Sequence, residues 1–252
     1  MEVLLISLAS LLAGFVDSVV GGGGLVLVPA LFAVYPSTHP ATLFGVNKSA
    51  GIWGTSMAAW QFSRRVSLRW RSVMPGAAAG FAGAMAGAWT VTVVSPDFLR
   101  RLLPAVLLAV LLYTLARKDM GRDHAPRMDG GRELAALCAI GLGIGFYDGF
   151  FGPGAGSFFV FLFVRWLGYD FLNASASAKV LNIATNLASL ILFTAKGHVW
   201  WHLALPLAAA NVAGSLLGTR MAMKHGTGFV RGMFILVVSA LILKTGYDAF
   251  LR

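Results

Sequence analysis

GFVDSVVGGGG, from Gly14 to Gly24, returns in the second half of the chain as GFYDGFFGPGAG, from Gly145 to Gly156. With a constant offset of 131 residues the two stretches align without a gap, and the match continues far beyond the glycines. The identical pairs include Asp17/Asp148, Gly21/Gly152, Lys48/Lys179, Phe62/Phe193, Trp70/Trp201, Pro75/Pro206 and Gly87/Gly218. Charged pairs are the most informative of these, because charges are unfavourable in an apolar setting. The chain is therefore an internal duplication.

The composition is that of an integral membrane protein. The 252 residues are 58% hydrophobic and 12% charged, with a mean hydropathy of +0.76. Runs such as Val73 to Val94 contain no charged residue, and about 20 apolar residues cross a bilayer as a helix. The net charge of +10 does not indicate a nucleic-acid partner, since most Lys and Arg residues lie at the ends of apolar segments and in one linker. A single cysteine, Cys138, excludes an internal disulfide or a thiolate metal cluster.

We predict an all-α, polytopic protein with a first membrane repeat over residues 1–116, a cytoplasmic linker over 117–132 and a second repeat over 133–252. The expected apolar segments are Val3–Val20, Leu25–Tyr35, Ala41–Phe62, Val73–Val94 and Phe98–Ala116, then Leu134–Phe151, Ser157–Trp166, Leu172–Ala195, Trp201–Met221 and Phe229–Phe250. The two segments on either side of each glycine turn are expected to be half-length helices. Each such pair forms one broken crossing or a re-entrant hairpin, which gives about eight membrane segments.

The orientation of the two copies follows from the positive charges. The loop Ser63–Arg71 carries four arginines in the first copy, whereas its equivalent in the second has only Lys196. The next loop reverses the bias, with Arg220, Lys224 and Arg231 in the second copy. A re-entrant hairpin plus three full crossings per copy would make the repeats inverted, with both basic loops inside. Eight simple crossings in two parallel copies is the alternative.

Lys48 and Lys179 are the candidate centre of a binding site, since each lies about seven residues inside a predicted span. In the second copy a polar stripe at spacings of three and four accompanies the lysine and contains Asn182 and Asn186. In the first copy the same face carries Lys48, Gly51 and Thr55, with Asn47 adjacent. Such stripes must face other helices or water, because facing lipid is unfavourable.

The glycine turns are the second candidate component. A helix that starts after such a turn presents free N–H groups and a partial positive charge, which suit an anion. We expect backbone and hydroxyl donors from Gly22, Gly23 and Gly24 in the first turn and from Gly154, Gly156 and Ser157 in the second. Asp17 and Asp148 either pair with the lysines to keep the buried charge neutral or carry a coupling proton or cation.

Signals for an enzyme are weak. His198 and His202 are four residues apart, but no acidic residue close by in the sequence completes a zinc site. There is no G-x-S-x-G motif, and the glycine run lacks the Lys-Ser/Thr ending of a P-loop. We expect no cofactor and no metal.

These motifs resemble the TauE/SafE sulfite exporter family, also called the 4-toluene sulfonate uptake permeases. The resemblance rests on GFVDSVVGGGGLVLVPAL from Gly14, VNK at residues 46–48, YDGFFGPGAGSF from Tyr147 and SAKVLNIATN from Ser177. It covers nearly the whole chain. One departure is Pro153, which stands where the first copy has Gly22, so the two half-sites differ chemically.

The resemblance implies a carrier of sulfite, sulfonates or related small organic anions in the bacterial inner membrane. We expect an anion site between the repeats, reached alternately from either side. The expected partners are a small anionic substrate, the lipid bilayer and protons as a coupling ion, with no nucleic acid. A passive anion channel and an intramembrane enzyme acting on a lipid-linked group are the alternatives. The substrate, the direction of transport and the oligomeric state, a homodimer included, stay open.

Overall fold

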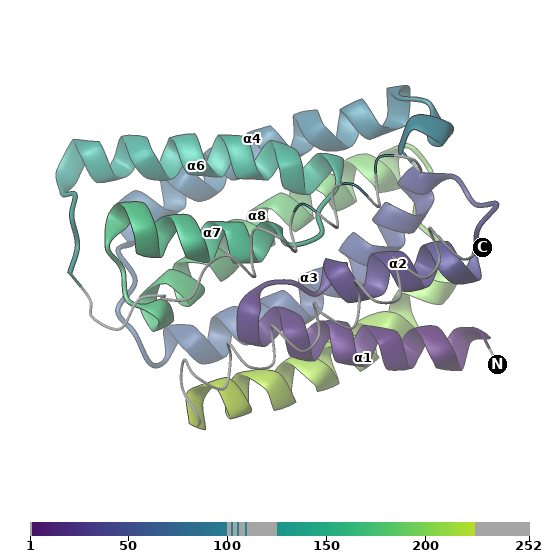
Figure 1. The fold of residues 1–252 in the computed structure, drawn as a ribbon, viewed down its shortest axis with the longest axis horizontal. Coiled ribbons are helices and arrows are strands. Elements are labelled where there is room, and N and C mark those ends of the chain that lie inside the picture. The colour runs from purple at the N-terminus through teal and green to yellow at the C-terminus, as the bar shows by residue number, and fades with distance from the viewer. Residues whose placement is uncertain (1, 100–101, 103–104, 106–108, 110–124, 225–252) are drawn as a thin grey trace.

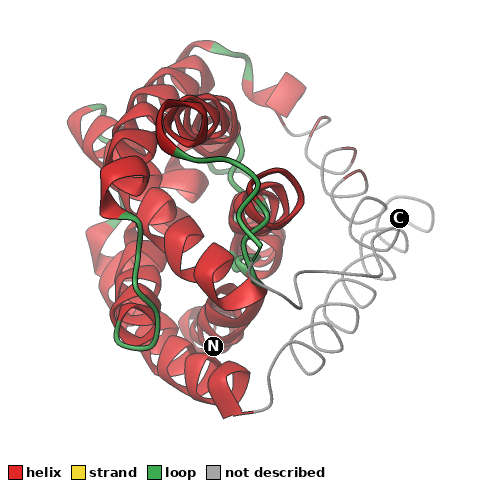
Figure 2. Cartoon of the chain, turned by 90° about the vertical axis from the view of Figure 1, so that its left-hand side faces the viewer, coloured by secondary structure: helices red, strands yellow, loops and turns green. Residues whose placement is uncertain are grey.

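The computed structural model describes residues 2–99, 102, 105, 109 and 125–224, and all regular structure in this part of the chain is helical (Figures 1 and 2). The first half contains α1 (Glu2–Val20), α2 (Gly24–Val34), α3 (Pro40–Ser63) and α4 (Trp70–Val93). The second half contains α6 (Gly130–Phe150), α7 (Ala155–Leu162), the short π-helix η1 (Phe163–Leu167), α8 (Phe171–Ala195) and the helix Trp201–Lys224.

Five described helices are long and apolar enough to cross a membrane, namely α1, α4, α6, α8 and Trp201–Lys224. The all-α, polytopic fold expected from the sequence is therefore confirmed. With 24 residues α3 is as long as α4, but the polar side chains around Lys48 lower its hydropathy. The predicted segment Phe229–Phe250 and most of Phe98–Ala116 lie outside the described residues, as do linker residues 117–124. The helix α6 starts at Gly130, inside the predicted linker.

Each glycine turn joins a long helix to a short one. In Figure 1, α2 returns alongside α1, and α7 returns alongside α6. The sequence expectation of two half-length helices was wrong for the first member of each pair, because α1 has 19 residues and α6 has 21. The apolar sequence before each turn contains no proline, so the helix continues up to the glycine turn. Figure 1 also shows α1 and α6 running in opposite directions, as inverted copies require.

Glycines allow α4 of the first half to pack directly on α6 of the second. A Cβ atom on Gly83 would lie 2.9 Å from the backbone nitrogen of Phe146, and one on Gly145 would lie 2.9 Å from the Cα of Gly80. These distances are shorter than real Cβ contacts, so the two backbones touch where only glycine fits. Other glycines of this seam are Gly76, Gly87, Gly141 and Gly149.

The equivalent contact joins α1 of the first half to the helix Trp201–Lys224 of the second. A Cβ atom on Gly14 would lie 2.9 Å from the Cα of Asn211, and one on Gly214 would lie 2.9 Å from the backbone nitrogen of Phe15. Gly14 and Gly214 are the repeat partners of Gly145 and Gly83. Each half thus packs one of its long helices on the first helix of the other half.

A buried polar cluster lies at the end of the bundle where α4 and α6 begin. Glu133, only 3% exposed, accepts hydrogen bonds from Arg69, Ser72 and the Tyr169 hydroxyl. Burial and the hydrogen bond to Glu133 raise the pKa of Tyr169 above its ordinary value. Arg69 also contacts Asp129, 3.2 Å away, so the arginine-rich loop and the start of α6 meet at one end of the molecule.

A second polar contact links the loop before α3 to the loop after α8. The rings of His39 and His198 stack with their centroids 5.2 Å apart, and the Thr42 hydroxyl lies 3.1 Å from Nδ1 of His198. Burial, together with the nearby His39 and Lys196, lowers the pKa of His198 below its ordinary value of 6.5. The neutral imidazole is therefore the form that this loop contact favours.

Candidate functional site

The two glycine turns meet inside the helix bundle. Gly21, Gly152 and Gly154 have φ angles of 82°, 90° and 81°, which other residues rarely adopt. The Ser157 N–H donates to the Gly21 carbonyl across a distance of 3.1 Å. A Cβ atom on Gly21 would lie 2.6 Å from the carbonyl carbon of Gly156, so a side chain at either position would push the turns apart. Glycine is required here for close approach as well as for conformation.

Each buried lysine is paired with the aspartate of the other copy. Lys48 Nζ lies 2.6 Å from Asp148 Oδ1, and Lys179 Nζ lies 3.0 Å from Asp17 Oδ2. Both lysine side chains are 3% exposed. Pairing matters because an unpaired charge at such depth would cost several kcal/mol. The two ion pairs therefore link the two halves of the chain and leave the four charges neutral in sum.

The two aspartates differ in the donors they receive. Asp17 accepts hydrogen bonds from the Thr55 hydroxyl at 3.0 Å and from the Gly23 N–H at 3.4 Å, in addition to the Lys179 ammonium. Lys179 also donates to the backbone carbonyl of Asp17. Asp148 is held by Lys48 through Oδ1, whereas its Oδ2 is buried and has no hydrogen-bond partner among the described residues. The two Lys–Asp pairs are thus equivalent by position in the repeat but differ in their hydrogen bonds.

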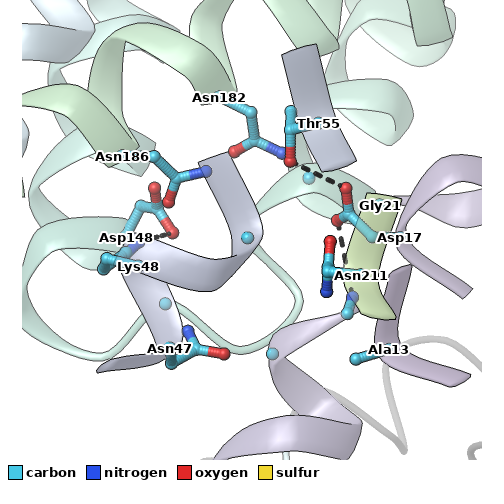
Figure 3. A pocket seen from close by; sticks show the side chains of 15 residues that line it. Ala13, Asp17, Gly21, Asn47, Lys48, Thr55, Asp148, Asn182, Asn186 and Asn211 are labelled. Carbon is cyan, nitrogen blue, oxygen red and sulfur yellow. Dashed lines mark hydrogen bonds and ion pairs between the residues drawn. The ribbon is translucent and has the colours of Figure 1, made fainter. Parts of the chain in front are cut away.

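A cavity of about 40 Å³ lies between these groups (Figure 3). Its walls come from α1, α3, α6, α8, the helix Trp201–Lys224 and both glycine turns. In the view of Figure 3, Lys48 and Asp148 lie on the left, Asp17 and Thr55 on the right, and Asn182 above, between them. Most of the wall is polar, which is unusual for the interior of a membrane bundle and indicates a functional cavity.

Ten of the fourteen residues proposed from the sequence line this cavity. They are Asp17, Gly23, Gly24, Asn47, Lys48, Thr55, Asp148, Gly156, Asn182 and Asn186. The other four are Lys179, Gly22, Gly154 and Ser157, which the structure does not place in the wall. The ammonium of Lys179 donates a hydrogen bond to Asp17. Of the two lysines, Lys48 is therefore the one whose side chain reaches the cavity.

The helix starts are less open to a ligand than the sequence suggested. The helices α2 and α7 begin at Gly24 and Ala155, so the turns do lead into helix N-termini. However, the Gly23 N–H donates to Asp17, and the Ser157 N–H donates to the other turn. These two donors hold the site together and are not free for an anion.

The sequence interpretation missed Asn211. This residue lies in the middle of the helix Trp201–Lys224 and lines the cavity, with its Nδ2 donating to the Ser10 carbonyl at 3.1 Å. Its Oδ1 is buried without a hydrogen-bond partner among the described residues. Its repeat equivalent is Gly80, so the duplication gives no signal for it. A carboxamide in the middle of an apolar span was the available signal.

Gly51 of α3, which the sequence places on the same face as Lys48 and Thr55, is useful for experiments. It lines the cavity, and a Cβ atom built on it would meet nothing within 4 Å. A side chain at this position would therefore enter the cavity without disturbing a helix contact.

Comparison with known proteins matches this chain to one family model and to proteins named as probable membrane transporters. A family model described as "Sulfite exporter TauE/SafE" matches residues 6–245. The "Probable membrane transporter protein YfcA" of Escherichia coli (strain K12) is 35% identical over 240 residues, covering 95% of this chain and 88% of that protein. The "Probable membrane transporter protein ORF9" of Sinorhizobium sp. is 35% identical over 237 residues, covering 94% of this chain and 89% of that protein. A "Probable membrane transporter protein" of Haemophilus influenzae is 32% identical over 237 residues, covering 94% and 91%. No solved structure matches the chain significantly.

Proposed function

Because the chain belongs to the TauE/SafE sulfite exporter family of multi-pass membrane proteins, we propose that it is a secondary transporter of small sulfur-containing or organic anions in the bacterial inner membrane. One observation carries this proposal beyond the family level. A polar cavity lies between the two halves of the chain and is bounded by crosswise Lys–Asp pairs from both. A site shared by two repeats becomes accessible to alternate sides when one repeat moves against the other.

Lys48 is the group that attracts the anion in this mechanism. Its ammonium lines the cavity and has three donor hydrogens, whereas Asp148 is its only ion-pair partner among the described residues. The carboxamides of Asn47, Asn182 and Asn186 add donors around it. Lys179 holds Asp17 in place, and this pair fixes the wall of the site.

The size of the cavity favours a compact substrate. A water molecule needs roughly 10–15 Å³ of cavity volume. A cavity of about 40 Å³ therefore accommodates about three water-sized groups. A sulfite or methanesulfonate ion is of this size, whereas an aryl sulfonate is far larger. We therefore propose sulfite and the shortest alkyl sulfonates as the substrate class.

The proposal is tested first by binding and then by flux. The purified protein is heated with sulfite, thiosulfate, methanesulfonate or sulfoacetate, with chloride and sulfate as controls, since a ligand of the folded state raises the melting temperature. Proteoliposomes then report uptake of any anion that stabilises the protein. Uptake that saturates with concentration supports a carrier, whereas flux that rises without saturation indicates the channel alternative. The absence of both stabilisation and flux with all four anions would refute the proposed substrate class.

Two variants test whether the anion binds in the cavity. Gly51→Val adds a side chain at the cavity wall, where a Cβ atom meets nothing within 4 Å, and is expected to abolish both stabilisation and uptake. Gly143→Val is its matched control, because Gly143 lies on α6 and a Cβ atom there also meets nothing within 4 Å, but it does not line the cavity. Equal uptake by these two variants would show that the anion binds elsewhere.

A further inference from the structure

The site is electrically neutral before any substrate binds. Two lysines and two aspartates form it, and all four groups are wholly or largely buried. An anion that enters would leave the buried cluster with an uncompensated negative charge, which is unfavourable in a poorly solvated interior. A positive charge that enters together with the anion would keep the buried site neutral.

The two aspartates are not equally suited to take up that positive charge as a proton. Asp17 receives donors from Lys179, Thr55 and Gly23, and hydrogen bonds to a carboxylate stabilise its charged form. Asp148 has one donor partner among the described residues, the Lys48 ammonium, and its buried Oδ2 is without any. Asp148 also lines the cavity and is 3% exposed. A proton on its Oδ2 would break no existing hydrogen bond.

Few charged groups lie near Asp148 in the described part of the chain. Lys48 reaches it from α3, while Asp17 of α1 lies across the cavity and is paired with Lys179 of α8. On α6 itself the neighbouring Tyr147 donates its hydroxyl proton to the Pro153 carbonyl, 2.6 Å away. The sequences of α4 within the bundle and of α7 contribute no titratable side chain, since Arg71 stands at the very start of α4. Lys48 is thus the only cation in contact with Asp148 in the described part of the chain.

We propose that Asp148 carries the coupling proton, so that one proton crosses the membrane with each monovalent anion. This inference rests on the transporter function proposed above. A proton from water binds the carboxylate of Asp148, and the Lys48 ammonium is released from its ion pair to hold the anion. After the site opens to the other side, the anion leaves, the proton returns to water and the Lys48–Asp148 pair forms again. The charge of the buried site is the same at every stage.

The test uses full-length protein in proteoliposomes with radiolabelled methanesulfonate, an anion that stays ionised over the whole pH range used. Two modes are compared, namely exchange of internal for external methanesulfonate without a gradient, and accumulation driven by an acidic exterior. A trapped pH-sensitive dye reports proton entry. Asp148→Asn mimics the protonated state permanently, and Asp129→Asn makes the same chemical change at a side chain that is 87% exposed and distant from the cavity.

Wild type and Asp129→Asn are expected to accumulate methanesulfonate above the external concentration and to acidify the interior. Asp148→Asn is expected to exchange methanesulfonate but to equilibrate it without accumulation or acidification. Gradient-driven accumulation by Asp148→Asn, or loss of exchange in a variant that remains monodisperse and helical, would overturn the proton assignment while leaving the transporter function intact. If wild type exchanged neither methanesulfonate nor sulfite, the proposed transport of small sulfur-containing anions would itself be in conflict with the result, independently of the role of Asp148.

A second measurement does not depend on the folding of a variant. Infrared difference spectra of wild type, recorded on addition of methanesulfonate, detect the C=O band of a protonated carboxyl group. The proposal requires that band to appear with the anion. Anion binding without it would overturn the assignment even if Asp148→Asn cannot be purified.

Discussion

Removing one lysine at a time should reveal the asymmetry of the two ion pairs. Lys48→Met leaves Asp148 buried at 3% exposure, with neither of its oxygens bonded to another described residue. Loss of one member of a buried pair costs about 3–5 kcal/mol of folding free energy. Lys179→Met leaves Asp17 with the Thr55 hydroxyl and the Gly23 N–H, and its side chain is 16% exposed. We expect this second variant to lose only about 1–3 kcal/mol.

The assay is reversible unfolding in mixed detergent micelles at alkaline pH, followed by helical circular dichroism. The double variant Lys48→Met with Asp148→Asn serves as the control, because it removes both charges and should recover most of the stability lost in Lys48→Met. Two results would refute the reasoning. One is a Lys48→Met protein that is no less stable than Lys179→Met, and the other is a double variant in which the two losses simply add.

Three further predictions concern other parts of the fold. Gly145→Ala should destabilise the protein by about 1–3 kcal/mol, since its Cβ would lie 2.9 Å from the Gly80 Cα. Gly143→Ala, which meets nothing within 4 Å, should not destabilise it, and equal unfolding free energies would contradict the packing explanation. Tyr169→Phe removes a donor from the buried Glu133 and should cost about 1–3 kcal/mol in the same unfolding assay. Because the pKa of His198 is lowered in the folded state, stability should be complete above pH 6.5 and fall as the pH drops below it. That slope should be smaller in His198→Gln, and an unchanged slope would exclude His198 as its source.

Local sequence patterns were sufficient to locate the helices and most of the cavity wall. Uninterrupted apolar runs predicted α1, α4, α6 and α8 to within a few residues at each end. The few charged residues that both copies share indicated Lys48 and Asp148 as site residues, because a charge that occurs at the same place in two apolar spans needs a common cause.

Local sequence patterns could not predict which lysine pairs with which aspartate. Periodicity along one helix indicates which residues share a face, but it contains no information about which lysine meets which aspartate. The crosswise pairs depend on how α3 and α8 lie against α6 and α1 in three dimensions. The difference between Asp17 and Asp148 depends on Thr55, whose repeat equivalent is Asn186, and on how each glycine turn is placed. Asn211 was missed because its counterpart in the first copy is a glycine.

The crosswise ion pairs also constrain how the protein is made. Synthesis proceeds from the N-terminus, so Lys48 enters the membrane about 100 residues before Asp148 exists. Until then the Lys48 ammonium lacks its carboxylate partner, and α3 is not among the five described helices that are long and apolar enough to cross a membrane. We therefore expect stable insertion of α3 to depend on the later synthesis of α6, which supplies Asp148. The contact that neutralises Lys48 in the finished structure therefore also links the insertion of α3 to the synthesis of the second half of the chain.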